Sequence, residues 1–153
     1  MFEVAVVGAG PGGLSAAGRC AELGVEHVLL ESTPKLANTI QKYQRGKHVM
    51  AEPGFLPLRS AVDFDIGKRE EILDTWEQAV ESLGVNIRYG AEVSGIEGEK
   101  GGFTLRLASG ETIEAKHVIL GIGVQGNPRK LGVPGEEAEC VQYQPGRSGR
   151  ISG

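Results

Sequence analysis

The stretch Val4-Ala5-Val6-Val7-Gly8-Ala9-Gly10-Pro11-Gly12-Gly13 decides the fold of this chain. Its apolar part extends back to Phe2, and a strand that is apolar at nearly every position is typical of a parallel sheet covered on both faces. The glycines follow at once, and an amphipathic helix is expected over about residues 11–23, ending at Gly24. This order predicts the first β-α unit of a nucleotide-binding α/β fold.

Each glycine of this turn has a physical role in such a site. Gly8 permits the tight turn, Gly10 lets backbone amides approach a phosphate without an intervening Cβ, and Gly13 lets the helix pack close to the strand. Pro11 and Gly12 complete the turn. The pyrophosphate of a dinucleotide is therefore expected at the positive end of the helix.

An acidic residue follows at the distance that this site requires. Residues 25–30 form a second apolar run, and Glu31 comes directly after it, about 20 positions beyond Gly10. A carboxylate there accepts hydrogen bonds from both ribose hydroxyls and repels a 2′-phosphate. We therefore expect FAD or NAD, rather than NADP, as the first cofactor.

The rest of the chain extends the parallel sheet and then interrupts it. An apolar stripe that includes Ile72, Trp76 and Leu83 predicts a helix ending at Gly84, and residues 85–89 predict a third parallel strand. Short alternating runs at residues 91–96, 103–107 and 112–115 then predict an antiparallel three-stranded meander, with a returning apolar strand at 117–120. The predicted fold is α/β, a Rossmann-like FAD/NAD(P)-binding three-layer fold with a parallel sheet and a meander.

Two motifs together resemble the FAD domain of the thioredoxin-reductase-like flavoproteins, which carry two dinucleotide-binding domains. The first is the glycine turn with Glu31; the second is the stretch Ala115-Lys116-His117-Val118-Ile119-Leu120-Gly121-Ile122-Gly123, which precedes Pro128 and the segment Leu131-Gly132-Val133-Pro134-Gly135-Glu136. The resemblance covers residues 1–137, the expected domain, and residues 138–153 are expected to form a flexible tail. In that family the turn reads Ala-Thr-Gly, so Gly121-Ile122-Gly123 departs at two of three positions.

The resemblance implies a set of FAD contacts. Asn38, Thr39 and Ile40 fall where the family threads its chain past the flavin ring, although a solvated loop is the alternative interpretation. The glycine turn would hold the pyrophosphate, Glu31 and its neighbours the ribose, the backbone near Val93 the adenine, and the second turn the inner part of the cofactor. The cofactor-binding residues so expected are Gly8, Gly10, Pro11, Gly12, Gly13, Glu31, Ser32, Lys35, Asn38, Thr39, Val93, Gly121 and Gly123.

Departures from the family narrow the chemistry. No cysteine lies between Cys20 and Cys140, which excludes flavoproteins that keep a redox disulfide shortly after the second strand. Residues 124–153 are too few for the NAD(P)H domain or for the returning segment that completes the FAD site. The chain is expected to be either a fragment of a longer reductase or a domain completed by another chain, and self-association is a further hypothesis.

Composition excludes several other classes of function. A net charge of −4 argues against nucleic acid or an anionic membrane as partner, and no apolar run is long enough to span a bilayer, so a cytoplasmic protein is expected. Neither cysteine belongs to a redox pair or a metal-ligand cluster, so no metal is expected.

The leading hypothesis is the FAD domain of a NAD(P)H-dependent oxidoreductase, with NAD(P)H reaching it through a domain that this chain lacks. The flavin carries the chemistry in such proteins, so no catalytic side chain is assigned. The alternatives are a dinucleotide-binding or regulatory domain without turnover, and an NAD-dependent dehydrogenase domain, against which the meander argues.

Overall fold

A computed structural model describes residues 1–50, 59–124 and 129–138 of the chain. The chain divides into two compact units, Met1–Gly123 and Val124–Gly153. All helices and strands of the described residues lie in the first unit. In the second unit, the carboxylate of Glu136 accepts hydrogen bonds from the amides of Leu131 and Gly132, at 2.6 and 2.5 Å, and so organises the Val-Pro-Gly-Glu loop. The predicted tail lies outside the described residues, except for Ala138.

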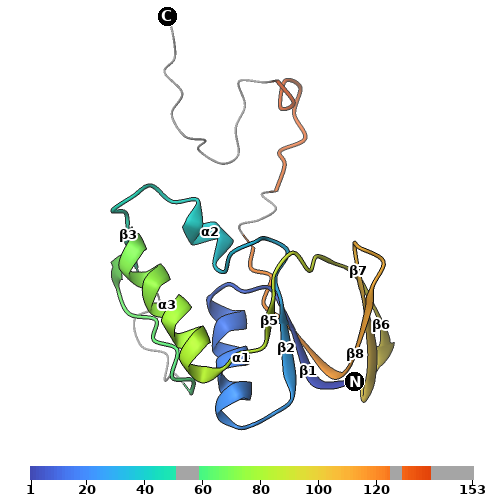
Figure 1. Ribbon diagram of the computed structural model, residues 1–153. Coiled ribbons are helices and arrows are strands. Elements are labelled where there is room, and N and C mark those ends of the chain that lie inside the picture. The colour runs from blue at the N-terminus through green and yellow to red at the C-terminus, as the bar shows by residue number, and fades with distance from the viewer. Residues whose placement is uncertain (51–58, 125–128, 139–153) are drawn as a thin grey trace, which may run out of the picture. The chain divides into compact units, whose positions relative to one another are not determined.

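The first unit is built on a six-stranded sheet with the order β5-β2-β1-β8-β7-β6 (Figure 1). Neighbours among β5, β2, β1 and β8 are parallel, whereas β8, β7 and β6 run antiparallel, as the predicted meander requires. A two-stranded sheet, β3-β4, stands apart. The elements are β1 (Phe2–Val7), α1 (Pro11–Glu22), β2 (His27–Leu30), α2 (Asn38–Gln41), β3 (His48–Val49), β4 (Gly67–Lys68), α3 (Arg69–Leu83), β5 (Ile87–Arg88), β6 (Val93–Glu99), β7 (Gly102–Leu107) and β8 (Thr112–Leu120).

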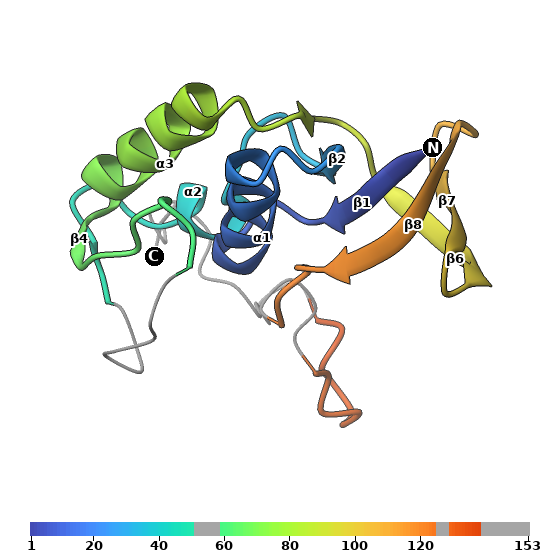
Figure 2. The ribbon, with the colours of Figure 1, turned by 90° about the horizontal axis from the view of Figure 1, so that it is seen from below.

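Helices α1 and α3 pack side by side on one face of the parallel strands (Figures 1 and 2). Of the predicted stripe of α3, Ile72 and Trp76 are buried and Leu83 is half-buried against the same core. Trp76, 2% exposed, donates an indole N–H hydrogen bond of 2.7 Å to the carbonyl of Asp63. Gly84 ends α3 in the left-handed conformation at φ +66°, which glycine adopts without steric cost. Trp76, which lies on the predicted apolar stripe, is therefore a core residue.

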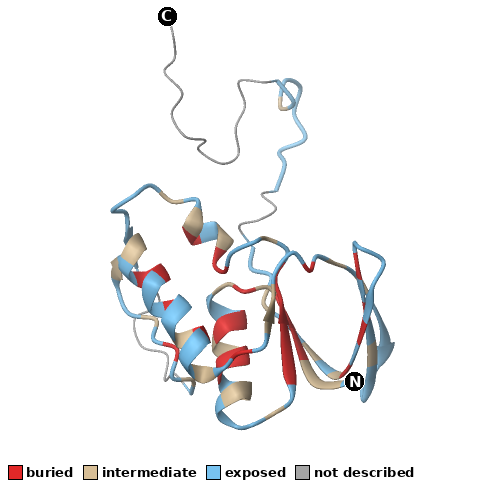
Figure 3. Ribbon diagram, in the orientation of Figure 1, coloured by how far each residue is buried: buried red, intermediate tan, exposed pale blue. Residues whose placement is uncertain are grey.

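The other face of the parallel strands is covered by the meander. Val28 and Leu30 of β2 share a buried cluster with Leu105 of β7 and Ile113 of β8. Figure 3 shows buried residues in the helices and in the strands of the six-stranded sheet. The unit therefore has three layers, of helices, parallel strands and meander, as the sequence predicted.

The predicted strand boundaries need two corrections. The third strand of the meander and the returning strand are one continuous strand, β8, which pairs with β7 at its start and with β1 towards its end. Lys116, which separates the two predicted runs, stays within the strand: its carbonyl accepts a hydrogen bond of 3.1 Å from the amide of Gly101, and its ammonium pairs with Glu3 at the surface. The predicted strand 85–89 shrinks to Ile87–Arg88, the part that pairs with β2.

Candidate dinucleotide site

The glycine turn lies where the carboxyl ends of three strands meet. The amide of Gly8 donates to Leu30 at the end of β2, and the amide of Gly121, just past β8, donates to Val7, each at 2.7 Å. Gly8 has a φ of +94°, which a residue with a Cβ rarely adopts. The crevice at the carboxyl ends of strands is where open α/β sheets bind their ligands.

Two of the glycines are required by the packing of the fold itself. A Cβ on Gly13 would lie 1.8 Å from the carbonyl oxygen of Gly8, which no native structure accommodates. A Cβ on Gly121 would lie 2.9 Å from the nitrogen of Gly13. The close helix–strand contact expected at Gly13 is therefore present, and Gly121 approaches the same point from β8.

At Gly10 and Gly12, by contrast, the packing of the protein does not exclude a side chain. A Cβ on Gly10 would meet only the carbonyl oxygen of Gly121, at an ordinary 3.9 Å, and one on Gly12 would meet nothing within 4 Å. Gly10 also has a φ of −79°, which any residue adopts. Among the described residues no side chain caps this end of α1, so no side chain accepts from its first-turn amides. The arrangement leaves room and donors for an anion.

Glu31 is buried beside this turn, with 6% of its surface exposed. Its Oε2 accepts a hydrogen bond of 2.8 Å from the amide of Ala9, within the glycine turn. Its Oε1 accepts from the amide and hydroxyl of Thr33, at 2.9 and 2.8 Å, and from the hydroxyl of Ser32 at 3.3 Å. The carboxylate is thus held rigidly at the end of β2.

This arrangement leaves Glu31 able to accept more hydrogen bonds. A carboxylate offers about four lone-pair sites, and Oε2 uses one of its two. The Thr33 hydroxyl lies 2.8 Å from both Glu31 and the carbonyl of Lys35 but has one proton, so it can turn from one acceptor to the other. Glu31 therefore keeps hydrogen-bond acceptor capacity beyond its bond to Ala9.

A second connection joins the glycine turn to α2. The amide of Ala37 donates to the carbonyl of Ala9 at 2.8 Å. Ala37 is 2% exposed and is the only non-glycine residue with positive φ in the described part of the chain, at +52°. Such a conformation is strained for alanine and often marks a ligand site. Asn38, half-buried, and Thr39, exposed, follow it as the first residues of α2.

Arg69, at the start of α3, holds the other end of α2. Its guanidinium donates to the carbonyls of Ile40 and Gln41 at 3.2 and 2.7 Å, and also to Glu70 at 3.0 Å. These carbonyls belong to the last residues of α2, and that of Ile40 also accepts from the amide of Tyr43 at 3.0 Å. Arg69 therefore fixes the position of α2 against α3.

The loop before β6 lies next to Glu31 on its other side. The amide of Ala91 donates to the Glu31 carbonyl at 2.8 Å, and that of Gly90 donates to Thr33 at 3.3 Å. Burial, with the negative charges of Glu77 and Glu31, raises the pKa of the half-exposed Tyr89. Val93, expected near the adenine, follows this loop as the first residue of β6 and packs against the buried cluster that contains Val28 and Leu30.

The structure therefore brings together the glycine turn, Glu31, Ser32, Ala37 and Gly121. Lys35 is exposed, and its carbonyl accepts a hydrogen bond from the hydroxyl of Thr33. Gly123, two residues after Gly121, has a φ of +64°. Sequence reasoning missed Thr33 and Tyr89. The position of Thr33, two residues after Glu31, could have indicated its bonds to the carboxylate, because short polar side chains commonly bond to groups nearby in the chain.

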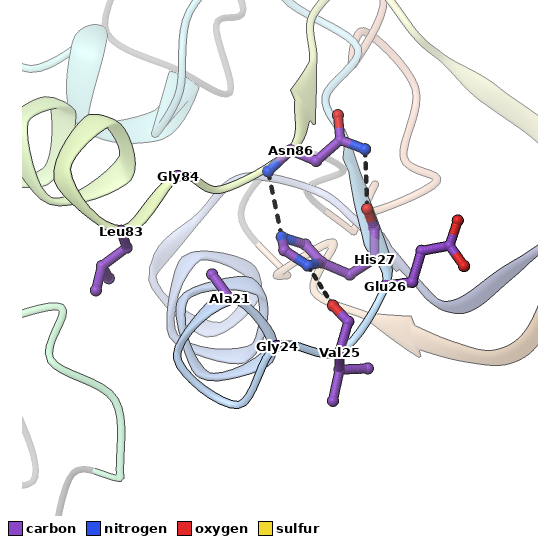
Figure 4. Close-up of a pocket in the computed structure, with 8 residues that line it drawn as sticks. All are labelled: Ala21, Gly24, Val25, Glu26, His27, Leu83, Gly84 and Asn86. Carbon is purple, nitrogen blue, oxygen red and sulfur yellow. Dashed lines mark hydrogen bonds between the residues drawn. The ribbon is translucent and has the colours of Figure 1, made fainter.

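A shallow pocket of about 310 Å³ lies at the opposite, amino-terminal end of the strands (Figure 4). Its polar groups bond to each other: His27 donates from Nδ1 to Val25 at 2.8 Å, and its Nε2 accepts from the amide of Asn86 at 3.2 Å. Asn86 donates in turn to the His27 carbonyl. These bonds give His27 a structural role, in which it joins the start of β2 to the segment before β5.

Neither metal-ligand clusters nor spanning helices occur in the residues described. No three His, Cys, Asp or Glu residues there gather to hold a metal ion. No helix in residues 1–50, 59–124 or 129–138 is long and apolar enough to cross a membrane.

Comparison with known proteins matches residues 5–149 to the family described as pyridine nucleotide-disulphide oxidoreductase. A ferredoxin–NADP reductase of Ignicoccus hospitalis is 33% identical over 145 residues, which cover 94% of this chain and 43% of the relative. One from Gluconacetobacter diazotrophicus is 29% identical over 99% of this chain and 43% of the relative. The chain thus spans less than half the length of these relatives.

Solved structures share the fold. The bacillithiol disulfide reductase Bdr of Staphylococcus aureus matches 90% of this chain and 43% of that protein, with a TM-score of 0.74 and 20% identity. The thioredoxin reductase of Lactococcus lactis matches 90% of this chain and 40% of that protein, with a TM-score of 0.68 and 25% identity. The resemblance and the fold predicted from the sequence are confirmed, and the chain belongs to the pyridine nucleotide-disulphide oxidoreductase family.

Proposed function

We propose that this chain is the FAD-binding part of a NAD(P)H-dependent flavoprotein oxidoreductase. The observation that carries the proposal is the free space at Gly10 and Gly12, which the protein's own packing does not explain. A pyrophosphate at the start of α1 explains it, because a side chain at Gly10 would occupy the position of the phosphate.

The residues around that space fit an adenine dinucleotide. The amides of the first turn of α1 would bind the pyrophosphate, and Oε2 of Glu31 would accept from the ribose. The loop at Tyr89–Ala91 would lie beside the adenosine, since its amides already bond to Glu31 and Thr33. The buried negative charge of Glu31 would disfavour a 2′-phosphate, which supports FAD over NADP at this position.

Asn38 and Thr39 are proposed to border the flavin side of the site, with Gly121 and Gly123 at its inner part. The first of these assignments is supported by the bond between Ala37 and Ala9, which places the start of α2 at the glycine turn. The flavin, when bound, supplies the hydride and electron transfer. The chain's own residues bind and orient it, and none is assigned as an acid, base or nucleophile.

NAD(P)H and the electron acceptor are proposed to reach the flavin through the remainder of the fold. The relatives of which this chain spans 43% are named ferredoxin–NADP reductases, so a reductase of this kind is the activity we propose for the complete assembly. A cytoplasmic location is proposed as well, supported by the absence of a paired-cysteine framework from the sequence.

The test is the near-ultraviolet and visible absorption spectrum of the purified chain, taken before and after FAD is added and the protein is desalted. We expect flavin bands to remain with the chain, and Gly10→Val to abolish them. Gly95→Val is the matched control, because Gly95 also has open space around its Cβ position but lies in β6. A folded chain that never retains FAD would support a domain for another dinucleotide, or one without a ligand.

A further inference from the structure

Hydrogen-bond donors to the carboxylate of Glu31 are divided unequally between its two oxygens. Within the described part of the chain, Oε2 accepts from the amide of Ala9 alone, at 2.8 Å. Oε1 accepts from the amide and the hydroxyl of Thr33, at 2.9 and 2.8 Å, and from the hydroxyl of Ser32 at 3.3 Å. Since each oxygen of an ionised carboxylate offers about two lone-pair sites, Oε2 keeps a site open to a further donor, whereas Oε1 is filled.

Backbone amides alone are sufficient to orient this carboxylate. The amide of Ala9 holds Oε2 and the amide of Thr33 holds Oε1, so each oxygen has a donor that does not depend on a side chain. Glu31 is also buried, which restricts the other conformations of its side chain. The hydroxyl of Thr33 is therefore not needed to fix the orientation of Glu31.

The hydroxyl of Thr33 lies between two acceptors, Oε1 of Glu31 and the carbonyl oxygen of Lys35, each at 2.8 Å. The hydroxyl has a single proton, and rotation about its Cβ–Oγ1 bond is enough to turn that proton from one acceptor to the other. If the hydroxyl leaves Glu31, its proton still has a partner, so the exchange leaves no donor unsatisfied. Oε1 can therefore give up this donor at little cost.

We propose that Thr33 is a specificity-determining residue for the ribose, because its hydroxyl holds a site on Oε1 of Glu31 that a ribose hydroxyl takes when the dinucleotide binds. One ribose hydroxyl would donate to the open site on Oε2. The other would replace the Thr33 hydroxyl on Oε1, and that hydroxyl would turn to the carbonyl of Lys35. Binding then adds a hydrogen bond at Oε2 and exchanges one donor for another at Oε1. The inference rests on the proposed dinucleotide site.

The test compares the binding of FAD with that of two FAD analogues, which lack either the 2′- or the 3′-hydroxyl of the adenosine ribose. Each ligand is titrated against the purified chain and followed by flavin fluorescence. In wild type, one analogue should bind at least about tenfold more weakly than FAD, because a hydrogen bond to a charged acceptor is lost without replacement. The other analogue should lose less than about threefold in affinity, because the Thr33 hydroxyl returns to Oε1.

Thr33→Val removes the hydroxyl that makes this exchange possible. Loss of the second ribose hydroxyl is then uncompensated, so the smaller of the two affinity losses should rise to about tenfold. Thr33→Ser keeps a hydroxyl and should show the wild-type pattern. The matched control is Thr104→Val, at an exposed threonine of β7, which should leave all three affinities unchanged. If Thr33→Val does not fold, Thr33→Ala removes the same hydroxyl and carries the same expectation.

A purely structural role of Thr33 would give a different pattern, because all three ligands would bind Thr33→Val more weakly by the same factor. That result would overturn the proposal, as would a Thr33→Ser variant that behaves like Thr33→Val. A wild-type chain that binds none of the three ligands would overturn the proposed function and this inference with it. A chain that binds FAD, but shows the same two affinity losses in wild type and in Thr33→Val, would overturn this inference alone.

Discussion

The amide of Ala9 donates a 2.8 Å hydrogen bond to Oε2 of Glu31, and this bond joins the glycine turn to the end of the second strand. Both residues are buried. Glu31 therefore stabilises the turn in addition to its proposed role at the ribose. A mutation of Glu31 would weaken dinucleotide binding both by removing the ribose contact and by loosening the turn.

This double role predicts that Glu31→Gln destabilises the chain even without a ligand. A glutamine NH₂ group would face an N–H donor in either orientation, the amide of Ala9 in one and that of Thr33 in the other. An unsatisfied buried donor costs about 1–3 kcal/mol, so the free energy of unfolding should fall by about that amount. Urea denaturation of the ligand-free protein measures it.

Glu114→Gln is the control for this substitution, because Glu114 is exposed on β8. Its effect should stay within about 0.5 kcal/mol. An equally small effect of Glu31→Gln would show that the carboxylate does not stabilise the turn.

Two glycines of the turn are predicted to differ in effect: substitution of Gly13 should lower the stability of the chain, whereas substitution of Gly10 should mainly weaken FAD binding. Gly13→Ala should lower the free energy of unfolding by about 3 kcal/mol or more, because its Cβ would collide with the carbonyl of Gly8. Gly10→Ala should cost less than about 1 kcal/mol in the ligand-free protein, since its Cβ has open space, yet should weaken FAD binding. Denaturation and flavin titration of both variants measure the two effects, and a Gly10→Ala variant that binds FAD normally would contradict the proposed phosphate position.

Much of this site could be predicted because the relevant pattern is local in the sequence. The turn from Gly8 to Gly13 and the acid at Glu31 follow strands, and the carboxyl ends of neighbouring parallel strands must meet at one edge of the sheet. The burial of Trp76 followed from helical periodicity alone.

The remaining features depend on contacts between distant segments. Nothing near Ala37 in the sequence indicates that its amide bonds to Ala9, or that its backbone is left-handed. The proximity of Tyr89 to Glu31 depends on how the loop before β6 crosses the end of β2. Likewise, the continuity of β8 follows from simultaneous pairing with β1 and β7, which no pattern within residues 112–120 specifies.

Arg69 is predicted to hold α2 in place. Arg69→Met would remove the hydrogen bonds to the carbonyls of Ile40 and Gln41, and should lower the free energy of unfolding by about 1–3 kcal/mol. Amide exchange in α2 should increase more than exchange in β1. The matched control is Arg19→Met, which removes an exposed pair with Glu22 and should cost less than about 1 kcal/mol. Unchanged exchange in α2 would contradict this role for Arg69.

The ion pair between Arg88 of β5 and Glu111, just before β8, predicts a pH-dependent contribution to stability. The two terminal guanidinium nitrogens, Nη1 and Nη2, donate to the carboxylate at 3.0 and 2.9 Å, and this pairing lowers the pKa of Glu111 below its ordinary value of 4.5. A carboxyl whose pKa is lowered by folding adds stability above its unfolded pKa and loses it as the pH falls through the folded pKa.

Wild type should therefore be more stable than Glu111→Gln at neutral pH, and the difference should vanish in acid below the lowered pKa. Because the pair is exposed, the difference should be small and should shrink at high salt. Urea midpoints of both proteins across the acid range, at low and high ionic strength, measure it. If the stability difference between wild type and Glu111→Gln stayed constant across the acid range, Glu111 would act through packing or neutral hydrogen bonds. The glutamine does not titrate, so a contribution from the charge of Glu111 must change with pH.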